Sequence, residues 1–135
     1  MSGPTPTDSS IVPTSSLQLL PITNISNSVS VKLNEDNYLV WKHQISSVFE
    51  SLDLIKFVNG SSQQPPEAST EFTVWNKLNK YVEICINATL SHSIAHVAVG
   101  TKTAFELWKK LQFLFAQQIS ANRIQLQTKL HQIKQ

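Results

Sequence analysis

Apolar side chains recur at gaps of three and four residues over four stretches of this 135-residue chain, and this spacing most constrains its fold. At 3.6 residues per turn, such gaps place the side chains on one side of a helix. The first two stripes are Tyr38, Trp41, Ile45, Val48, Phe49 and Leu52, and then Phe72, Trp75, Leu78, Val82, Cys85 and Ile86. The last two are Ala104, Leu107, Trp108, Leu111, Leu114 and Phe115, and then Leu126, Leu130 and Ile133, with Arg123 on the same side. The first three stripes each hold one tryptophan, so we expect Trp41, Trp75 and Trp108 to share a core.

Capping and stop signals separate these stretches into helices. Residues 34–37 offer Asn and Asp side chains that cap a helix start, and Gly60 follows an Asn at a usual helix stop. Thr103 and Glu106 form a capping box, and Ser120 is the expected start of the last helix. Outside residues 28–33, no window alternates apolar and polar residues over the length of a strand. The sequence therefore predicts an all-α, compact bundle of five to six helices.

The first thirty residues differ from the rest of the chain. Sixteen of these 30 residues are Ser, Thr or Pro and their only charge is Asp8, a composition with too little apolar periodicity to order itself. One apolar patch interrupts it, made of Leu17, Leu19, Leu20 and Ile22. We expect a flexible arm over residues 1–30 and a helical domain over residues 31–135. The last stripe runs to Ile133, so we expect the domain to be truncated at its last helix.

Several function classes are excluded by what the sequence lacks. No stretch approaches the roughly 18 apolar residues that span a bilayer, and no basic region precedes an apolar run at the start, so we expect a cytoplasmic protein with no membrane partner. The single Cys85 cannot form an intrachain disulfide, and its place on an apolar stripe indicates a buried structural thiol.

No set of residues with catalytic or metal-binding spacing is evident. His92 and His96 stand four apart, but Ser93 occupies the position where a helical zinc protease carries Glu, and no third ligand follows. No serine lies in a glycine-flanked strand–turn–helix elbow. We therefore predict a protein that is not an enzyme and that has no metal site, no cofactor and no small-molecule substrate.

Charge is distributed unevenly along the chain. Residues 101–135 carry six basic residues against Glu106 alone, a net charge of +5, whereas residues 1–100 carry five basic and eight acidic residues, a net charge of −3. A basic segment attracts RNA phosphates or an acidic surface on a neighbouring copy. The candidate RNA contacts are Lys109, Lys110, Arg123, Lys129 and Lys134. The sequence shows neither a run of five basic residues nor aromatic residues interleaved with basic ones, so these two features do not support the RNA interpretation.

Several ordered blocks resemble one known family. The blocks are Lys32-Leu33-Asn34, Asn37-Tyr38-Leu39-Val40-Trp41-Lys42, Leu52-Asp53-Leu54, Phe57-Val58-Asn59-Gly60, Pro65-Pro66, Trp75, Thr103-Ala104, Leu107-Trp108, Leu111, Phe115, Arg123-Ile124-Gln125-Leu126, Leu130 and Ile133-Lys134. In their order and spacing they are similar to the Gag protein of copia-type LTR retrotransposons, particularly those of plants. The resemblance covers residues 31–135 and corresponds to the N-terminal half of the capsid region.

The resemblance implies a capsid-type structural role. Such proteins are all-α units that assemble into a virus-like particle around the element's RNA, so the implied partner is a second copy of the chain. The residues shared with the family and expected in the core are Tyr38, Trp41, Leu52, Gly60, Trp75, Leu107, Trp108, Leu111 and Phe115. Leu126, Leu130 and Ile133 are the expected assembly face.

This chain departs from the family in two respects. Asn79 stands where members commonly carry an acidic residue, and one cysteine cannot form the family's RNA-binding zinc knuckle, which makes RNA the weaker partner. Two alternatives to a capsid-type assembler remain. One is an RNA-binding adaptor that uses the basic C-terminal third, and the other is a host-repurposed Gag fragment that docks a cellular protein.

Overall fold

The computed structural model describes residues 21–134, and these residues form helices and no strand. The helices are α2 (Ile22–Ser28), α3 (Tyr38–Ser51), α4 (Thr70–Ala88), α5 (Ala104–Leu114) and α6 (Ala116–Lys134), with short 3-10 helices at η1 (Ile55–Phe57) and η2 (Ala95–Ala98). The closest approach to a sheet is one parallel bridge between Leu33 and Leu90. The all-α prediction is confirmed.

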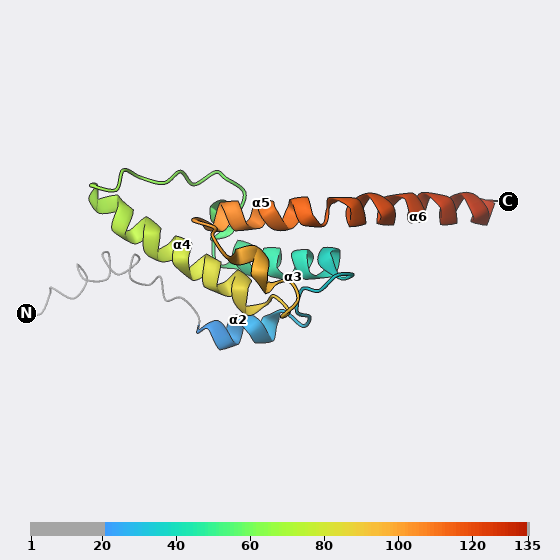
Figure 1. Ribbon diagram of the computed structural model, residues 1–135, viewed down its shortest axis with the longest axis horizontal. Coiled ribbons are helices and arrows are strands. Elements are labelled where there is room, and N and C mark those ends of the chain that lie inside the picture. Colours follow the sequence, from blue (N-terminus) through green and yellow to red (C-terminus); the bar gives the residue numbers. More distant parts are fainter. Residues whose placement is uncertain (1–20, 135) are drawn as a thin grey trace, which may run out of the picture.

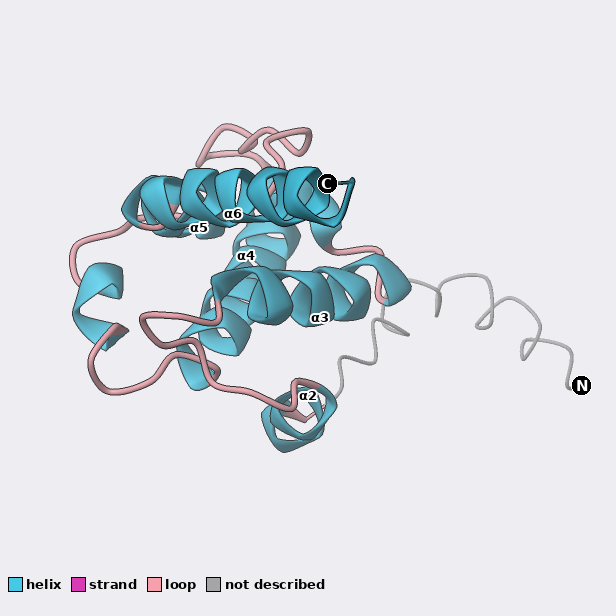
Figure 2. Ribbon diagram, turned by 90° about the vertical axis from the view of Figure 1, so that its right-hand side faces the viewer, coloured by secondary structure: helices cyan, strands magenta, loops and turns pink. Residues whose placement is uncertain are grey.

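The core lies where α3 crosses α5, with α4 on one side and α2 below (Figures 1 and 2). The Tyr38 ring stacks on Phe115 with ring centroids 4.9 Å apart, and the Trp41 ring lies 5.7 Å from that of Trp108. The Trp41 indole Nε1 donates a hydrogen bond of 3.0 Å to Thr89 Oγ1, which attaches α3 to the end of α4. This bond satisfies the polar atom of a fully buried tryptophan.

Most residues expected in the core are buried, and the exceptions lie at its edge. Tyr38, Trp41, Leu107, Trp108, Leu111 and Phe115 are buried. Leu52 and Trp75 are half-buried, and Trp75 packs on Phe57 and donates a hydrogen bond to Ser62 rather than joining the other two tryptophans. Gly60 has φ +85°, and a Cβ there would lie 3.0 Å from the Phe105 ring, so its role is to turn the chain after η1.

The start of the helical domain differs from the expected boundary at residue 31. Residues 22–28 form α2, which packs on α3 and α4, and Ile25 of the helix and Val29 just after it are buried. These two residues stand four apart, so they lie on the same side of this short segment, although the Thr, Asn and Ser residues of α2 are weak helix formers. The expected arm therefore does not extend to residue 30. Leu17, Leu19 and Leu20 lie outside the described residues.

The last helix begins earlier than Ser120 and projects from the body. α5 and α6 are separated by Phe115 alone, whose backbone N–H still bonds to the Leu111 carbonyl at 3.1 Å. Because the interruption is so short, α6 continues the direction of α5 and extends away from the other helices instead of folding back on the bundle (Figure 1). Its 19 residues make it about 28 Å long at 1.5 Å per residue.

Replacing Trp108 by Ala tests the α3–α5 contact. Trp108 contacts the rings of Trp41 and Phe49, so truncation leaves a large cavity and should lower the free energy of unfolding by about 3–5 kcal/mol. Chemical denaturation followed by circular dichroism measures this loss. Phe113→Ala is the matched control, because Phe113 is on the same helix and 86% exposed, and its effect should stay within about 0.5 kcal/mol. Equal effects of the two variants would contradict this core.

Candidate assembly surface

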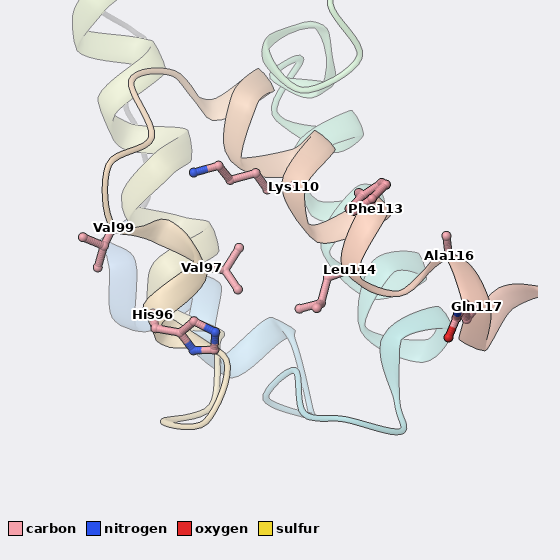
Figure 3. Close-up of a pocket in the computed structure, with 8 residues that line it drawn as sticks. All are labelled: His96, Val97, Val99, Lys110, Phe113, Leu114, Ala116 and Gln117. Atoms are coloured by element: carbon pink, nitrogen blue, oxygen red, sulfur yellow. The ribbon is translucent and has the colours of Figure 1, made fainter.

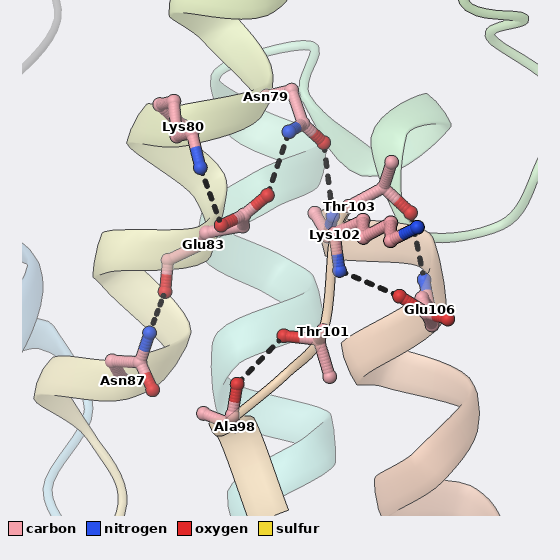
Figure 4. A network of polar contacts seen from close by, with 10 residues as sticks. Asn79, Lys80, Glu83, Asn87, Ala98, Thr101, Lys102, Thr103 and Glu106 are labelled. Carbon is pink, nitrogen blue, oxygen red and sulfur yellow. Dashed lines mark hydrogen bonds and ion pairs between the residues drawn. The ribbon is translucent and has the colours of Figure 1, made fainter.

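A polar network fixes the N-terminus of α5 against α4 (Figure 4). Thr103 Oγ1 accepts the Glu106 backbone N–H at 3.1 Å, and Glu106 Oε1 accepts the Lys102 N–H at 2.6 Å. The expected capping box is present in modified form, because the carboxylate reaches the amide of Lys102 rather than that of Thr103. The N–H of Ala104, the first residue of α5, has no acceptor within its own helix and donates to Asn79 Oδ1 at 2.9 Å.

Asn79 is the residue that joins the two helices. Its Nδ2 donates to Glu83 Oε2 at 2.7 Å while its Oδ1 accepts from Ala104, so both ends of the amide are used. Glu83 is nearly buried and its other oxygen lies 3.4 Å from Lys80 Nζ. An amide meets these needs because it offers a donor and an acceptor side by side. This explains physically why Asn fits here, where the resemblance leads one to expect an acidic residue.

With its inner side held in this way, α5 presents a basic and aromatic face to solvent. We call Lys102, Phe105, Lys109, Lys110 and Phe113 the α5 face, and all five side chains are exposed. Lys109 Nζ lies 5.2 Å above the Phe105 ring. Phe105, Lys109 and Phe113 stand four apart in one row, so aromatic and basic residues do interleave, contrary to the sequence interpretation. The i, i+4, i+8 spacing was the signal that could have revealed the row.

An open groove of about 570 Å³ runs beside this face, between η2 and the junction of α5 with α6 (Figure 3). Val97, Val99, Phe113 and Leu114 make it mostly apolar, and Lys110 and His96 supply its basic groups. Val99 is 78% exposed, which is high for an apolar side chain. The groove and the α5 face share Lys110 and Phe113, so together they form one continuous exposed surface.

The predicted assembly face on α6 lies in solvent. Leu126 and Leu130 are 62% and 60% exposed, whereas Ile119, near the start of α6, packs against the core. The side chain of Ile133 is outside the described part of the structure, as is that of Lys134. Arg123 and Lys129 are exposed on the same helix, which has no acidic residue. Of the proposed RNA contacts, Lys109 and Lys110 lie together on α5, whereas Arg123 and Lys129 lie farther along the projecting helix.

The remaining titratable groups are not gathered into a site. Within residues 21–134, no three His, Cys, Asp or Glu side chains are close enough to hold a metal ion. Cys85 is buried, and this burial raises the pKa of its thiol to about 11 even though a hydrogen bond with Tyr81 lowers it in part, so the thiol is un-ionised and inert at neutral pH. No helix in the described part is long and apolar enough to cross a membrane.

Comparison with known proteins identifies the family to which this chain belongs. Residues 45–135 match the family model described as gag-polypeptide of LTR copia-type. Because the match covers more than half of the chain, this protein belongs to the copia-type Gag family. The resemblance seen in the sequence is thereby confirmed. Gag polypeptides are structural proteins rather than catalysts.

Two plant proteins are similar to this chain. One is a retrovirus-related Pol polyprotein from transposon RE1 of Arabidopsis thaliana, 27% identical over 120 residues, covering 82% of this chain and 8% of the polyprotein. The corresponding polyprotein from transposon RE2 of the same plant is 27% identical over 104 residues, which cover 70% of this chain and 7% of that polyprotein. The chain thus spans less than a tenth of either relative. No solved structure matches it.

Replacing Asn79 by Asp tests the hydrogen bonds through which this residue joins α4 to α5. The new carboxylate still accepts the Ala104 N–H but faces the Glu83 carboxylate with no proton to donate, so at neutral pH the free energy of unfolding should fall by about 1–3 kcal/mol. Protonation of either carboxyl restores the missing donor. The stability deficit relative to wild type should therefore shrink as the pH is lowered.

The double variant Asn79→Asp with Glu83→Gln is the control for this prediction. Its Gln side chain supplies a donor to the new Asp and removes the second negative charge, so most of the lost stability should return at neutral pH. Urea titrations of the three proteins at neutral and acidic pH measure both effects. A deficit that does not change with pH or with Glu83→Gln would show that Asn79 is not the residue that joins these helices.

Proposed function

We propose that this protein is a self-association module of the Gag capsid type, which joins other copies of itself into a shell around the RNA of its element in the cytoplasm. Membership of the copia-type Gag family supports the capsid-like role. The observation that carries the proposal is α6, which projects from the domain with Leu126 and Leu130 exposed on one side. A projecting helix gains stability when exposed apolar side chains such as these are buried against another copy.

Spacing on α6 suits pairing between helices. Ile119, Arg123, Leu126 and Leu130 follow one another at gaps of four, three and four residues, the repeat of a coiled-coil seam. Since α6 has basic residues and no acidic one, its copies repel each other at long range. Added salt screens this repulsion, so pairing through α6 should strengthen with ionic strength.

Charged residues on the seam test this pairing. Leu126→Asp with Leu130→Asp places two carboxylates in the apolar contact and should reduce association while leaving helix content unchanged. Light scattering against protein concentration measures the mass, and circular dichroism measures the helix content. Gln125→Asp with Thr128→Asp is the matched control, because it adds the same charge on the other side of α6. Equal particle mass for the wild type and the seam variant would rule out this role for α6.

RNA contact is the second candidate function, and the exposed basic residues along α5 and α6 favour it. Lys109, Lys110 and Arg123 all lie in solvent on helices that follow one another in one direction. Phosphate contacts of this kind release counterions, so binding weakens steeply as salt is added.

The triple variant Lys109→Glu, Lys110→Glu and Arg123→Glu tests RNA contact. Affinity for single-stranded RNA, measured by fluorescence anisotropy at several salt concentrations, should fall in the wild type as salt rises and be nearly lost in the variant. Binding that is unaffected by salt, or retained by the variant, would contradict this function for α5 and α6.

A further inference from the structure

Two exposed faces, one on α3 and one on α5, have complementary charge. The first is the α5 face defined above. The second, which we call the α3 face, consists of Leu39, Val40, His43 and Glu50 on the helix and Asp36 just before it, all exposed. At 100° per residue the α3 positions lie on the side of that helix away from its buried Tyr38, Trp41, Ile45 and Phe49.

The charges on these two faces differ in sign. Three lysines dominate the α5 face, and the neighbouring Glu106 is occupied as the acceptor of the Lys102 N–H. The α3 face has two carboxylates and no Lys or Arg. Lys42 of the same helix lies 5.8 Å over the Tyr38 ring and lines a groove with Phe105 and Lys109 of the α5 face. Ion pairs between described residues join Lys56 to Asp53 and Lys80 to Glu83, so none of them neutralises either face.

Apolar side chains on the two faces are also suited to each other. Phe105 and Phe113 stand between the lysines of the α5 face, and Leu39 and Val40 are 41% and 52% exposed on the α3 face. Each face thus combines exposed apolar residues with charge of one sign. Interfaces between proteins combine these features, with apolar and aromatic residues at the centre and charges that set orientation at the rim.

The two faces cannot meet within one molecule. α3 and α5 pack through their inner sides, where Tyr38 stacks on Phe115 and Trp41 lies on Trp108, so both outer faces point away from the shared core. Their complementarity can only be satisfied between copies. A contact of two different faces leaves one of each free on every dimer, and repetition then produces a ring or a filament rather than a closed pair.

We propose that the α5 face of one copy binds the α3 face of a second copy, with Lys102, Lys109 and Lys110 opposite Asp36 and Glu50, and Phe105 and Phe113 against Leu39 and Val40. This inference rests on the proposed self-association and names the surface through which a part of it occurs. Single-stranded RNA is the competing occupant of the α5 face, because its bases stack on exposed aromatic rings. RNA does not explain the acidic and apolar α3 face, so we favour a second copy.

Charge reversal of each face separately tests the contact. One variant carries Lys109→Glu with Lys110→Glu, and the other carries Asp36→Lys with Glu50→Lys. Each alone places like charges against each other, so self-association measured by light scattering at low salt should weaken at least about tenfold. An equimolar mixture should regain wild-type association, since every contact between unlike variants again joins opposite charges. Glu67→Lys with Glu71→Lys is the control, because it changes the net charge as the second variant does but lies in the loop before α4 and in its first turn.

Each other outcome has a definite meaning. If both variants and their mixture associate as the wild type does, the contact lies elsewhere, and the inference fails while self-association stands. If only the lysine variant is impaired, and the wild type associates only when oligouridine RNA is added, the α5 face binds RNA and the inference fails. If the wild type keeps a monomer mass at all concentrations and salts, with and without RNA, the inference and the proposed self-association both fail. Denaturation midpoints of all variants identify any loss that is due to unfolding.

Discussion

The packing of α3 on α5 and on Phe115, which follows it, through five aromatic rings is the interaction on which the rest of the structure depends. Tyr38 stacks on Phe115 at one end, Trp41 meets Trp108 in the middle, and Phe49 reaches the same tryptophan from the next turn. Large rings bury much apolar surface per residue, so a small domain can obtain most of its hydrophobic stabilisation from one contact of this kind. α4 buries Val82, Cys85 and Ile86 in the same core and is joined to it by two hydrogen bonds, which the Trp41 indole donates to Thr89 and the Ala104 N–H donates to Asn79.

This contact also determines which surfaces remain exposed. Because α3 and α5 use their inner sides for the core, the outer side of each helix is left in solvent, where one is acidic and the other basic. The same geometry directs α6, since Phe115 is held in the core and only one residue separates the two helices. These exposed sides are the surfaces on which the proposed contacts between copies rest.

Ionic strength affects the two proposed contacts in opposite directions. Pairing of α6 brings basic helices together and is helped by salt, whereas the contact between the α3 and α5 faces joins opposite charges and is weakened by salt. A protein with both contacts therefore assembles in different ways at low and at moderate ionic strength. The basic and aromatic composition of the α5 face also suits RNA, so a copy that binds RNA there would leave its α3 face free for a neighbour.

Much of this architecture could be predicted from the chain because helical periodicity is a local property. The stripes containing Trp41 and Trp108, the capping residue Thr103 and the turn at Gly60 were all evident from spacing and residue type. The family was also evident from the sequence, because the residues that this chain shares with it recur in order.

The helix α2 was not predictable from the sequence. α2 has weak helix formers and is held by burial of Ile25 and Val29, which only the neighbouring helices provide.

By itself, then, the sequence determined the all-α class, the helices that carry a strong apolar stripe and the excess of positive charge in the C-terminal third. Only the tertiary structure decided that Asn79 would join α4 to the start of α5, that Trp75 would lie at the edge of the core, and that α6 would project into solvent. The physical reason is that periodicity specifies which side of a helix is apolar, whereas the partner of that side depends on packing among segments far apart in the chain. Exposed faces such as those of α3 and α5 follow from that packing.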